Sequence, residues 1–456
     1  MSDIGLDDGM LGTRLAIVMA FVLVSVCDGM ASEERPNVIV ILTDDQGSVD
    51  AGCYGASDIE TPAIDGLAAR GIRFTQFYAA APVCSPSRAG LLTGRYPVRA
   101  GVPGNVSSQP GAQGMPSAQE TIAEVFRASG YVTAHIGKWH LGYSAETRPE
   151  AQGFLHSFGH MGGCIDNYSH FFYWNGPNRH DLWRNGQEVF ADGQFFQDLM
   201  LQEARRFLSE HREDPFFVYF ALNSPHYPYQ GRASFLEKYA NVPYPRNLYA
   251  AFLSTADETV GRLVGLVREL GLEEDTIIVF QSDHGHSVEV RAHRGGGSAG
   301  SFRGAKFSLF EGGIRVPAII SWPGHLAEGE SRNQVGHGCD WLPTLAELCD
   351  ISLTGKDLDG LSLAPVLRDA SANSPHEVIH WQGAGKSAQW AIRSGDWKLI
   401  GNPSDPVHPD SLGDADRLFL ANIARDPSER KNLAAEEPDR VAELKALHQR
   451  WVESWR

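Results

Sequence analysis

The sequence has few cysteines and few basic residues, and each shortage excludes a class of protein. Its 456 residues include six cysteines, which show no metal-finger spacing and are too sparse for a disulfide scaffold. Lys and Arg number 39 against 56 Asp and Glu, and the resulting net charge of −17 argues against a nucleic-acid binder, which needs a basic face. Because this charge also repels anionic substrates, any anion site must be locally positive.

A long apolar run is also missing, which excludes a stable membrane span. The apolar run Leu15–Val26 is too short for a comfortable transmembrane helix. Arg14 precedes it, and small residues around Met30 offer a cleavage site. We therefore predict a signal peptide over residues 1–31 and a secreted or periplasmic protein, with Met1 or Met10 as the start.

Composition and length indicate an ordinary globular protein. Hydrophobic residues make up 42% and charged residues 21% of the chain. The length suffices for a large core and a second, smaller domain. We find no internal repeats or low-complexity tracts, and the texture of the sequence changes near residue 355. We predict a catalytic domain over residues 35–355 and a C-terminal subdomain over residues 356–456.

Short, continuous apolar runs predict strands that are buried on both faces of a parallel sheet. Four of them end in polar motifs: Asn37–Thr43, Tyr131–Ile136, Phe216–Leu222 and Thr276–Gln281. Helical patterns lie between them, at Ala118–Ser129, Phe195–His211 and Leu248–Leu270. The fold class is therefore α/β, with a large mixed, mostly parallel sheet sandwiched by helices. Sites in such folds lie beyond the carboxyl ends of the strands, where the four motifs should meet.

The C-terminal part of the sequence predicts short antiparallel strands and a helix instead of buried parallel strands. Trp390–Arg393 and Trp397–Ile400 predict a hairpin, and Arg417–Asn422 adds a strand. Asp439–Trp455 is an amphipathic terminal helix. We expect a small α+β subdomain, with an antiparallel sheet covered by this helix.

Two of the polar motifs contain adjacent residues that can bind a cation. Asp44 and Asp45 follow the first strand, and their carboxylates are ready cation ligands or, alternatively, a capping or turn pair. Asp283 and His284 follow the strand that ends at Gln281. All four residues should lie at the same sheet edge.

The segment Pro82–Gly94 contains a Cys-x-Pro-x-Arg pattern formed by Cys84, Pro86 and Arg88. Pro86 is pre-set for the first turn of a helix, with Ser85 as a cap. Residue 84 should therefore sit just ahead of a helix N-terminus, where an anion is favoured, and Arg88 can reach back to it. The alternative is a buried structural cysteine before a helix.

A second block runs over Gly130–His140 and reads Gly-Tyr-x-Thr-x-x-Ile-Gly-Lys-Trp-His. Lys138 and His140 stand two apart, so on an extended segment they would point the same way and suit an anionic group. His226 follows the strand Phe216–Leu222 in a Ser-Pro-His setting. A solvated loop is the plain alternative for the Lys-Trp-His motif.

These blocks resemble the sulfatase family, in its formylglycine-dependent, arylsulfatase-like branch of the alkaline-phosphatase-like superfamily. The resemblance covers most of Arg35–Arg456. It implies that a formylglycine-generating enzyme oxidises Cys84 to formylglycine (3-oxoalanine). One hydroxyl of the hydrated aldehyde then attacks sulfur to form a covalent sulfate–enzyme intermediate, and the other expels sulfate.

The resemblance also implies one Ca²⁺ ion and its ligands, which are Asp44, Asp45, Cys84, Asp283 and His284. The family most often has Asn where this chain has His284. Hard cations prefer oxygen ligands, so direct ligation by His284 is left open. His286 and His293 lie close by in the sequence and leave a zinc-like cluster as an alternative.

The catalytic residues that the resemblance implies are Cys84, Arg88, Lys138, His140, His226 and Lys306. Arg88, Lys138 and Lys306 would neutralise charge on the sulfate oxygens. His226 with Lys306 would protonate the departing alcohol, and His140 would take a proton from the remaining hydroxyl.

The irregular segment Gly142–Gln194 is rich in histidine and aromatic residues, with His156, His160, His170, Trp174, His180 and Trp183. This segment could bind a sulfated sugar, or it could be a folded insertion whose histidines have no functional role. The substrate would be a sulfated carbohydrate or an aryl sulfate ester, and exo action on galactose or N-acetylgalactosamine sulfate is compatible with the sequence. Two alternatives remain, a phosphate or phosphonate ester hydrolase of the same superfamily and a non-catalytic secreted glycan-binding protein.

Overall fold

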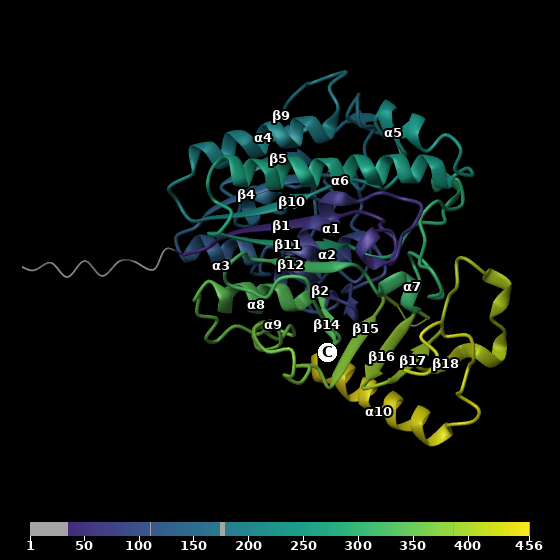
Figure 1. Ribbon diagram of the computed structural model, residues 1–456. Coiled ribbons are helices and arrows are strands. Elements are labelled where there is room, and N and C mark those ends of the chain that lie inside the picture. Colours follow the sequence, from purple (N-terminus) through teal and green to yellow (C-terminus); the bar gives the residue numbers. More distant parts are fainter. Residues whose placement is uncertain (1–34, 110, 174–177, 386, 456) are drawn as a thin grey trace, which may run out of the picture. The chain divides into compact units, whose positions relative to one another are not determined.

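The centre of the molecule is a ten-stranded sheet (Figure 1). The computed structural model describes residues 35–109, 111–173, 178–385 and 387–455. Across the sheet the strands run β13 (Glu330–Arg332), β2 (Ile72–Phe74), β12 (Ala318–Ser321), β11 (Thr276–Ser282), β1 (Asn37–Thr43), β10 (Phe216–Ala221), β4 (Val132–Lys138), β5 (His156–His160), β8 (Trp183–Arg184) and β9 (Gln187–Glu188). The neighbours β11, β1, β10 and β4 are mutually parallel, whereas β12, β8 and β9 pair antiparallel. The carboxyl ends of the four parallel strands β11, β1, β10 and β4 therefore lie at one edge of the sheet.

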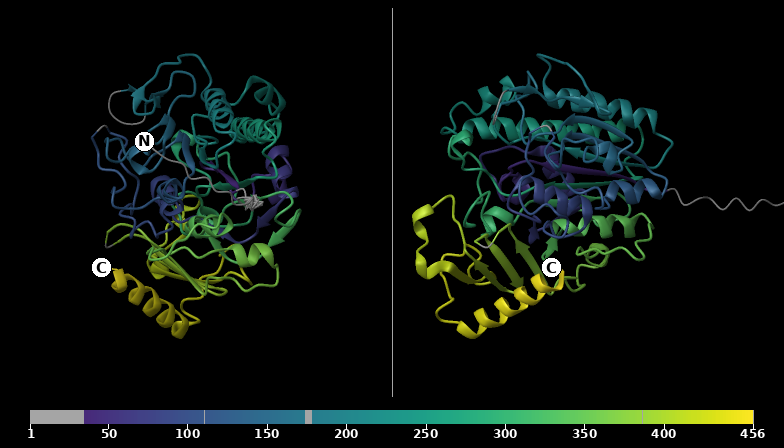
Figure 2. Two further views of the ribbon diagram at one scale, coloured as in Figure 1. Left: turned by 90° about the vertical axis from the view of Figure 1, so that its left-hand side faces the viewer. Right: turned by 180° about the vertical axis from the view of Figure 1, so that it is seen from behind.

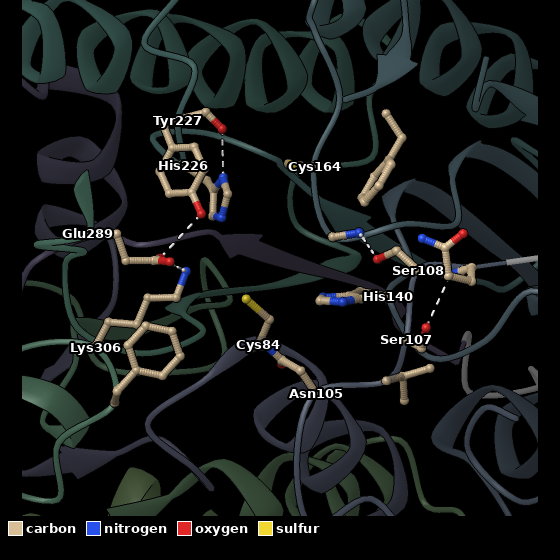
Figure 3. A pocket seen from close by; sticks show the side chains of 15 residues that line it. Cys84, Asn105, Ser107, Ser108, His140, Cys164, His226, Tyr227, Glu289 and Lys306 are labelled. Atoms are coloured by element: carbon tan, nitrogen blue, oxygen red, sulfur yellow. Dashed lines mark hydrogen bonds and ion pairs between the residues drawn. The ribbon is translucent and has the colours of Figure 1, made fainter. Parts of the chain in front are cut away.

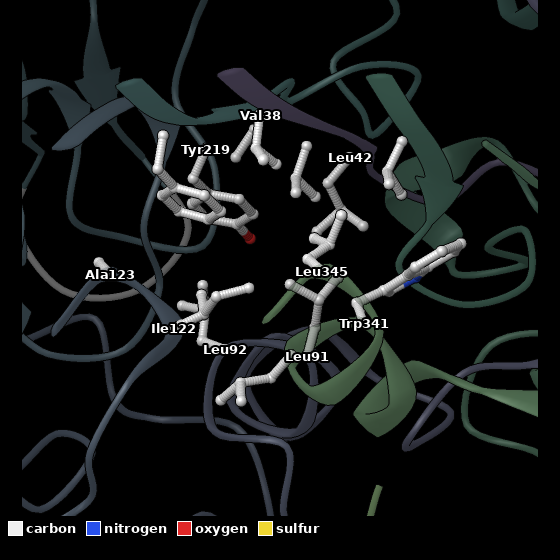
Figure 4. Packing of buried hydrophobic residues seen from close by; sticks show 14 of the residues in the cluster. Val38, Leu42, Leu91, Leu92, Ile122, Ala123, Tyr219, Trp341 and Leu345 are labelled. Carbon is white, nitrogen blue, oxygen red and sulfur yellow. The ribbon is translucent and has the colours of Figure 1, made fainter. Parts of the chain in front are cut away.

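Helices cover both faces because the central strands are apolar on both faces. Alternate residues of β1 serve different layers: Ile39 and Ile41 pack toward one face, Val38 and Val40 toward the other. The first face is covered by α1 (Pro62–Ala69), α4 (Phe196–Glu210) and α6 (Arg246–Glu269), with α5 (Ala233–Lys238) against α6. The second is covered by α2 (Cys84–Thr93), α3 (Ile122–Ala128) and α8 (Trp341–Leu348). Figure 4 shows this second layer, in which Leu91 and Trp341 lie below Leu42.

A second, four-stranded antiparallel sheet forms near the C-terminus. Its strands are β15 (Val378–Gln382), β16 (Trp390–Ser394), β17 (Trp397–Gly401) and β18 (Leu418–Asn422). Leu444 of α10 (Pro438–Trp455) packs with Leu399 and Leu420 on the outer face, along which Figure 2 shows this helix. On the inner face Trp381 and Phe419 pack against Phe310. The predicted fold class is confirmed in both parts.

The remaining elements are short. They are β3 (Phe77–Tyr78) paired with β14 (Gly336–His337), β6 (Phe171–Phe172) paired with β7 (Arg179–His180), α7 (Glu311–Ile314), α9 (Ala364–Arg368) and several 3₁₀ turns. Among the described residues, no helix combines the length and the apolar character needed to cross a membrane. The predicted signal peptide lies outside the described residues, and the domain boundary at residue 355 stays a prediction.

Several of the sequence-based bounds are wrong. The helix expected over Ala118–Ser129 begins only at Ile122, because Thr121 and Glu124 form a reciprocal capping box there. The stretch 356–456 contains α9 before the predicted hairpin, where we expected no helix. Gly142–Gln194, which reads as irregular, contributes β5, a strand parallel to β4 within the main sheet.

His135, on β4, makes the fold sensitive to acid. Its ring is fully buried beside the rings of Trp139 and Phe154, and burial lowers its pKa to about 3. The unfolded value is about 6.5, so the unfolded chain takes up the proton more readily. The contribution of neutral His135 to stability is therefore full above pH ~6.5 and is lost as the pH falls toward 3.

We expect His135→Phe to reduce the loss of unfolding free energy between pH ~7 and ~5 by roughly 2 kcal/mol, since one pKa unit corresponds to about 1.4 kcal/mol. Urea denaturation of the full chain at both pH values measures this difference. A His408→Gln variant is the control, because that side chain is exposed. An unchanged pH dependence in His135→Phe would show that His135 does not titrate on unfolding.

Candidate active site

The four polar motifs meet at one edge of the main sheet. Asp44 and Asp45 follow β1, and Lys138 is the last residue of β4. His226 comes a few residues after β10, and Asp283 directly follows β11. Since β11, β1, β10 and β4 are adjacent and parallel, the sheet itself places these side chains together.

Helix α2 brings Cys84 to the same edge, but it begins two residues earlier than the sequence predicts. Cys84 is its first residue, Val83 is the N-cap, and Ser85 does not cap the helix. Ser85 Oγ instead donates a hydrogen bond to the carbonyl of His140 at 2.7 Å. The backbone N–H of Ser85 is accepted by Asn105 Oδ1 at 3.0 Å, so a residue from another loop satisfies the free first turn.

The acidic residues form a buried cluster around Cys84. One donor atom from each of Asp44, Asp45, Cys84 and His284 lies within 4.8 Å of the others. Asp283 is not part of that group, although its Oδ1 lies 3.3 Å from His284 Nε2. His284 Nε2 also lies 3.4 Å from Cys84 Sγ, while its Nδ1 donates to the carbonyl of Gly285 at 3.0 Å. The imidazole is thereby held with Nε2 facing the cluster.

Two buried lysines pair with the two aspartates that follow β1. Lys138 Nζ lies 2.6 Å from Asp44 Oδ2, and Lys306 Nζ lies 2.8 Å from Asp45 Oδ1. All four side chains are at most 3% exposed. Such pairs are stable in a dry site only when the charges compensate one another.

Arg88 completes the set of basic groups from inside α2. Its Nη2 donates to Asp283 Oδ2 at 3.0 Å and lies 3.5 Å from Asp44 Oδ1, and its Nη1 donates to the carbonyl of Lys138 at 3.2 Å. The site therefore holds three carboxylates and three cationic side chains. In a chain of net charge −17, these opposite charges balance one another, and a bound divalent cation would make the site locally positive, as an anion requires.

His140 and His226 lie on different sides of Cys84. His226 Nδ1 donates to the carbonyl of Tyr227 at 2.7 Å, which leaves Nε2 facing Asp45, 3.8 Å from its Oδ2. We predicted an extended segment after Lys138, but His140 has a φ of 55° and the backbone is left-handed there. The side chains of His140 and His226 both line the cavity at Cys84. A side chain at Gly163 would come within 2.8 Å of the His140 ring, so glycine is needed there.

The charges around Cys84 act on its ionisation. Burial would raise the pKa of the thiol, but Lys138 and Lys306 outweigh burial and hold that pKa well below its usual range. Burial likewise would lower the pKa of Lys306, but Asp45 together with other acidic groups nearby outweighs burial and raises that pKa well above its usual value. Burial lowers the pKa of His140, which keeps its imidazole neutral.

A cavity of about 340 Å³ opens onto Cys84. Figure 3 shows Cys84 between Lys306 and His140, with His226 above it. The cavity is also lined by residues that sequence reasoning missed, namely Asn105, Val106, Ser107, Ser108, Gln109, Gly163, Cys164, Phe172, Tyr227, Glu289 and Phe307. These come from loops with no recognisable motif, and only their three-dimensional position marks them.

Most histidines of the segment Gly142–Gln194 lie away from this cavity. His156 pairs with Glu203 at 2.7 Å, and His160 Nδ1 bonds to the carbonyl of Gly162. From this segment the cavity receives Gly163, Cys164 and Phe172. Trp174 lies outside the described residues. Neither His286 nor His293 belongs to a group of potential metal ligands in the described part of the chain.

Comparison with known proteins identifies the kind of site. The Sulfatase family model matches residues 36–351, and the model of the N-sulphoglucosamine sulphohydrolase C-terminal region matches residues 301–454. Arylsulfatase A of Homo sapiens is 33% identical over 466 residues, with 93% of this chain and 89% of the relative covered. N-acetylgalactosamine-6-sulfatase of Sus scrofa is 34% identical, with 73% of this chain and 66% of the relative covered.

The fold has a similar match among solved structures. The crystal structure of Ps i-CgsB in complex with k-i-k-neocarrahexaose superposes with a TM-score of 0.82 at 29% sequence identity. The superposition covers 91% of this chain and 92% of that one.

Proposed function

Since this chain belongs to the sulfatase family and is an enzyme that hydrolyses sulfate esters, we propose that it removes sulfate from sulfated carbohydrates with a nucleophile made from Cys84 and with bound Ca²⁺. The observation that carries the proposal is the position of Cys84, at the floor of the cavity between a carboxylate cluster and three buried cations. A cysteine that served only the core would not need this polar surrounding.

The donor set fits a hard divalent cation. Asp44, Asp45 and Asp283 supply carboxylate oxygens in a buried position, with His284 Nε2 beside them. The three carboxylates balance three buried cations, so a divalent ion and an anionic substrate can enter together with little net charge left uncompensated. When bound, Ca²⁺ would polarise the sulfuryl group and lower the pKa of an attacking hydroxyl.

Cys84 is proposed to be converted to formylglycine by a formylglycine-generating enzyme, and the hydrated aldehyde supplies the attacking hydroxyl. Its place on the first turn of α2, at the positive end of the helix dipole, favours negative charge at that position. Arg88, Lys138 and Lys306 hold their positive charges around it and bind the sulfate oxygens. These residues are oriented before substrate arrives, because each is buried and ion-paired.

Proton transfer is assigned to two groups on different sides of Cys84. Lys306 keeps its proton, since Asp45 raises its pKa, and lies with His226 beside the cavity where the leaving alcohol would stand. Burial and Lys306 hold the pKa of His226 well below its usual range, so His226 is neutral and relays the proton at Nε2. Neutral His140 accepts a proton from the hydroxyl at residue 84.

The substrate class follows from relatives and from the cavity. The relatives include an N-acetylgalactosamine-6-sulfatase, and Ps i-CgsB was crystallised with k-i-k-neocarrahexaose. A cavity of about 340 Å³, lined by Asn105, Ser107 and Ser108, has room and hydrogen-bonding groups for a sugar ring. We propose a sulfated galactose or N-acetylgalactosamine residue as the group held there.

Matched esters test this function. We expect the purified, modified enzyme to release sulfate from 4-nitrophenyl sulfate and from sulfated galactose or N-acetylgalactosamine units, and to hydrolyse the matched phosphate ester at least about 100-fold more slowly in kcat/KM. A preference for the phosphate or phosphonate ester would contradict the proposal. Absence of turnover with every ester, in protein shown to carry the modification, would favour a glycan-binding role.

Removal of calcium should lower both activity and stability. We expect EGTA to abolish turnover, because the carboxylate cluster then has no divalent cation to bind the sulfate oxygens. The melting temperature should also fall, since an ion present at about 100 times its Kd contributes about 2.7 kcal/mol. Activity assays and thermal unfolding with EGTA, followed by added Ca²⁺, measure both effects. Full activity in EGTA, with no calcium found in the protein, would contradict the metal assignment.

A further inference from the structure

Outside the active site, two histidines and an aspartate meet where the hairpin of β6 and β7 lies against the segment 187–194. One donor atom from each of His170, His180 and Asp192 lies within 4.8 Å of the others. His170 directly precedes β6, and His180 ends β7. We propose that these three residues form a second metal site, which binds Zn²⁺ and fastens the hairpin to the following segment.

The hydrogen bonds of both imidazoles fix which nitrogen is free. His170 Nε2 lies 3.0 Å from the carbonyl of Gln194, which can only accept, so this nitrogen carries the proton. His180 Nδ1 lies 3.0 Å from the carboxylate of Glu188, so this nitrogen carries its proton as well. In each neutral ring the other nitrogen is then a bare lone pair. These two nitrogens, Nδ1 of His170 and Nε2 of His180, are therefore available to bind a cation.

The free nitrogens are buried and have no partner in the described part of the chain. His170 Nδ1 and His180 Nε2 are both shielded from solvent and accept no hydrogen bond from any described residue. The side chain of His170 is completely buried, and that of His180 is 5% exposed. A buried acceptor without a partner costs about 1–3 kcal/mol, and two such atoms in one cluster of potential ligands therefore indicate a missing ligand.

The supporting contacts are those of a metal-binding histidine. Such a histidine usually donates its outer N–H to a backbone carbonyl or a carboxylate, which orients the ring and increases its basicity. His170 has the carbonyl of Gln194, and His180 has the carboxylate of Glu188. The His180 ring is also held by Phe190, stacked on it at a centroid distance of 4.4 Å. Both ligands are therefore preoriented.

The ligand chemistry selects zinc over calcium. Two imidazole nitrogens and one carboxylate suit Zn²⁺, which takes four tetrahedral ligands at about 2.0–2.2 Å, whereas Ca²⁺ prefers six to eight oxygens. Two atoms bound to one such ion are at most about 4 Å apart. The side chain of Asp192 is exposed, so it can move the remaining short distance and leave the fourth position to water.

The proposed ion would also fix one wall of the active-site cavity. The same hairpin carries Phe172, which lines that cavity, and Phe172 pairs with Arg179 across the hairpin. All three proposed ligands flank this hairpin or the segment on which it rests. The proposed zinc site and the Ca²⁺ cluster share no ligand.

Zinc content is the direct test. The full chain, saturated with Ca²⁺, is incubated with Zn²⁺, desalted and analysed for zinc, and Co²⁺ is used in parallel as a spectroscopic probe. We expect one Zn²⁺ per chain and the intense visible absorption of four-coordinate Co²⁺. Asp192→Asn should weaken zinc binding by at least about 10-fold, by analogy with the loss of a supporting partner. The double variant H170Q/H180Q should bind no zinc.

Thermal unfolding gives a second readout. Zn²⁺ should raise the melting temperature of the wild type and raise that of Asp192→Asn much less. The control is the double variant H211Q/D214N, which removes another histidine–carboxylate pair (3.0 Å) from the surface and should retain one zinc. The proposal is overturned if the folded wild type retains no zinc. It is also overturned if Asp192→Asn and H170Q/H180Q bind Zn²⁺ as tightly as the control. If H170Q/H180Q does not fold, the zinc affinity of Asp192→Asn alone tests the proposal, because the Asp192 side chain is exposed.

Discussion

Cys84→Ala is expected to abolish sulfate release and leave the fold intact. Loss of a catalytic nucleophile typically lowers kcat by roughly 10⁴- to 10⁶-fold. The alanine variant cannot form the aldehyde, so no hydroxyl stands between the carboxylate cluster and the basic side chains. Replacement of a small buried side chain at the start of α2 should change the melting temperature only slightly. Sulfate release and thermal unfolding measure the two effects.

Cys164→Ala is the matched control for this variant. Cys164 is also buried and lines the same cavity, but it does not belong to the carboxylate cluster. We expect Cys164→Ala to retain activity within about 10-fold, since it changes only the shape of one wall by a small group. Equal losses in the two variants would mean that Cys84 contributes packing rather than chemistry, and wild-type turnover by Cys84→Ala would exclude it as the nucleophile.

Lys398→Met is expected to cause the largest loss of stability. Lys398 Nζ on β17 lies 2.8 Å from Glu311 Oε1 and 3.1 Å from Glu429 Oε1, and all three side chains are fully buried. Burial would raise the pKa of Glu311, but Lys398 and two nearby arginines together outweigh burial and lower that pKa to about 2. Without the ammonium group, Glu311 keeps its ion pair with Arg315 at 3.3 Å, but Glu429 loses its pair with Lys398 and negative charge remains buried beside it. We expect the unfolding free energy to fall by about 3–5 kcal/mol.

An exposed lysine serves as the comparison. Lys431 Nζ lies 2.7 Å from Glu436 Oε1, but both side chains are more than half exposed. Lys431→Met should therefore cost at most about 1 kcal/mol. Urea denaturation of the full chain compares the two variants. Similar small losses in both would show that the C-terminal sheet does not depend on Lys398 for its attachment to α7.

The central strands can be predicted because burial on both faces leaves a simple pattern. The run from Asn37 to Thr43 is apolar and β-branched, and β1 has these bounds. β5, with the sequence His-Ser-Phe-Gly-His, has no such pattern. It is a strand because it pairs with β4 along its length, and this pairing is a long-range contact. Long-range pairing likewise places β2 and β3, which are close in sequence, in two different sheets.

Some residues of the candidate site can be predicted from the sequence and others cannot. Asp44, Lys138 and Asp283 come directly at strand ends, so the sheet order is enough to bring them together. Asn105 and Glu289 have no motif, and their roles beside α2 and Lys306 follow from loop positions that no local pattern encodes. The cluster of His170, His180 and Asp192 likewise shows no ligand spacing typical of a metal site.

The chemical state of residue 84 tests the central claim most directly. Peptide mass spectrometry is performed on active enzyme isolated from a host that contains a formylglycine-generating enzyme. We predict that the peptide containing residue 84 has lost its thiol sulfur and carries an aldehyde, in a fraction that rises in proportion to specific activity. A fully active preparation in which residue 84 remains an unmodified cysteine would contradict the account.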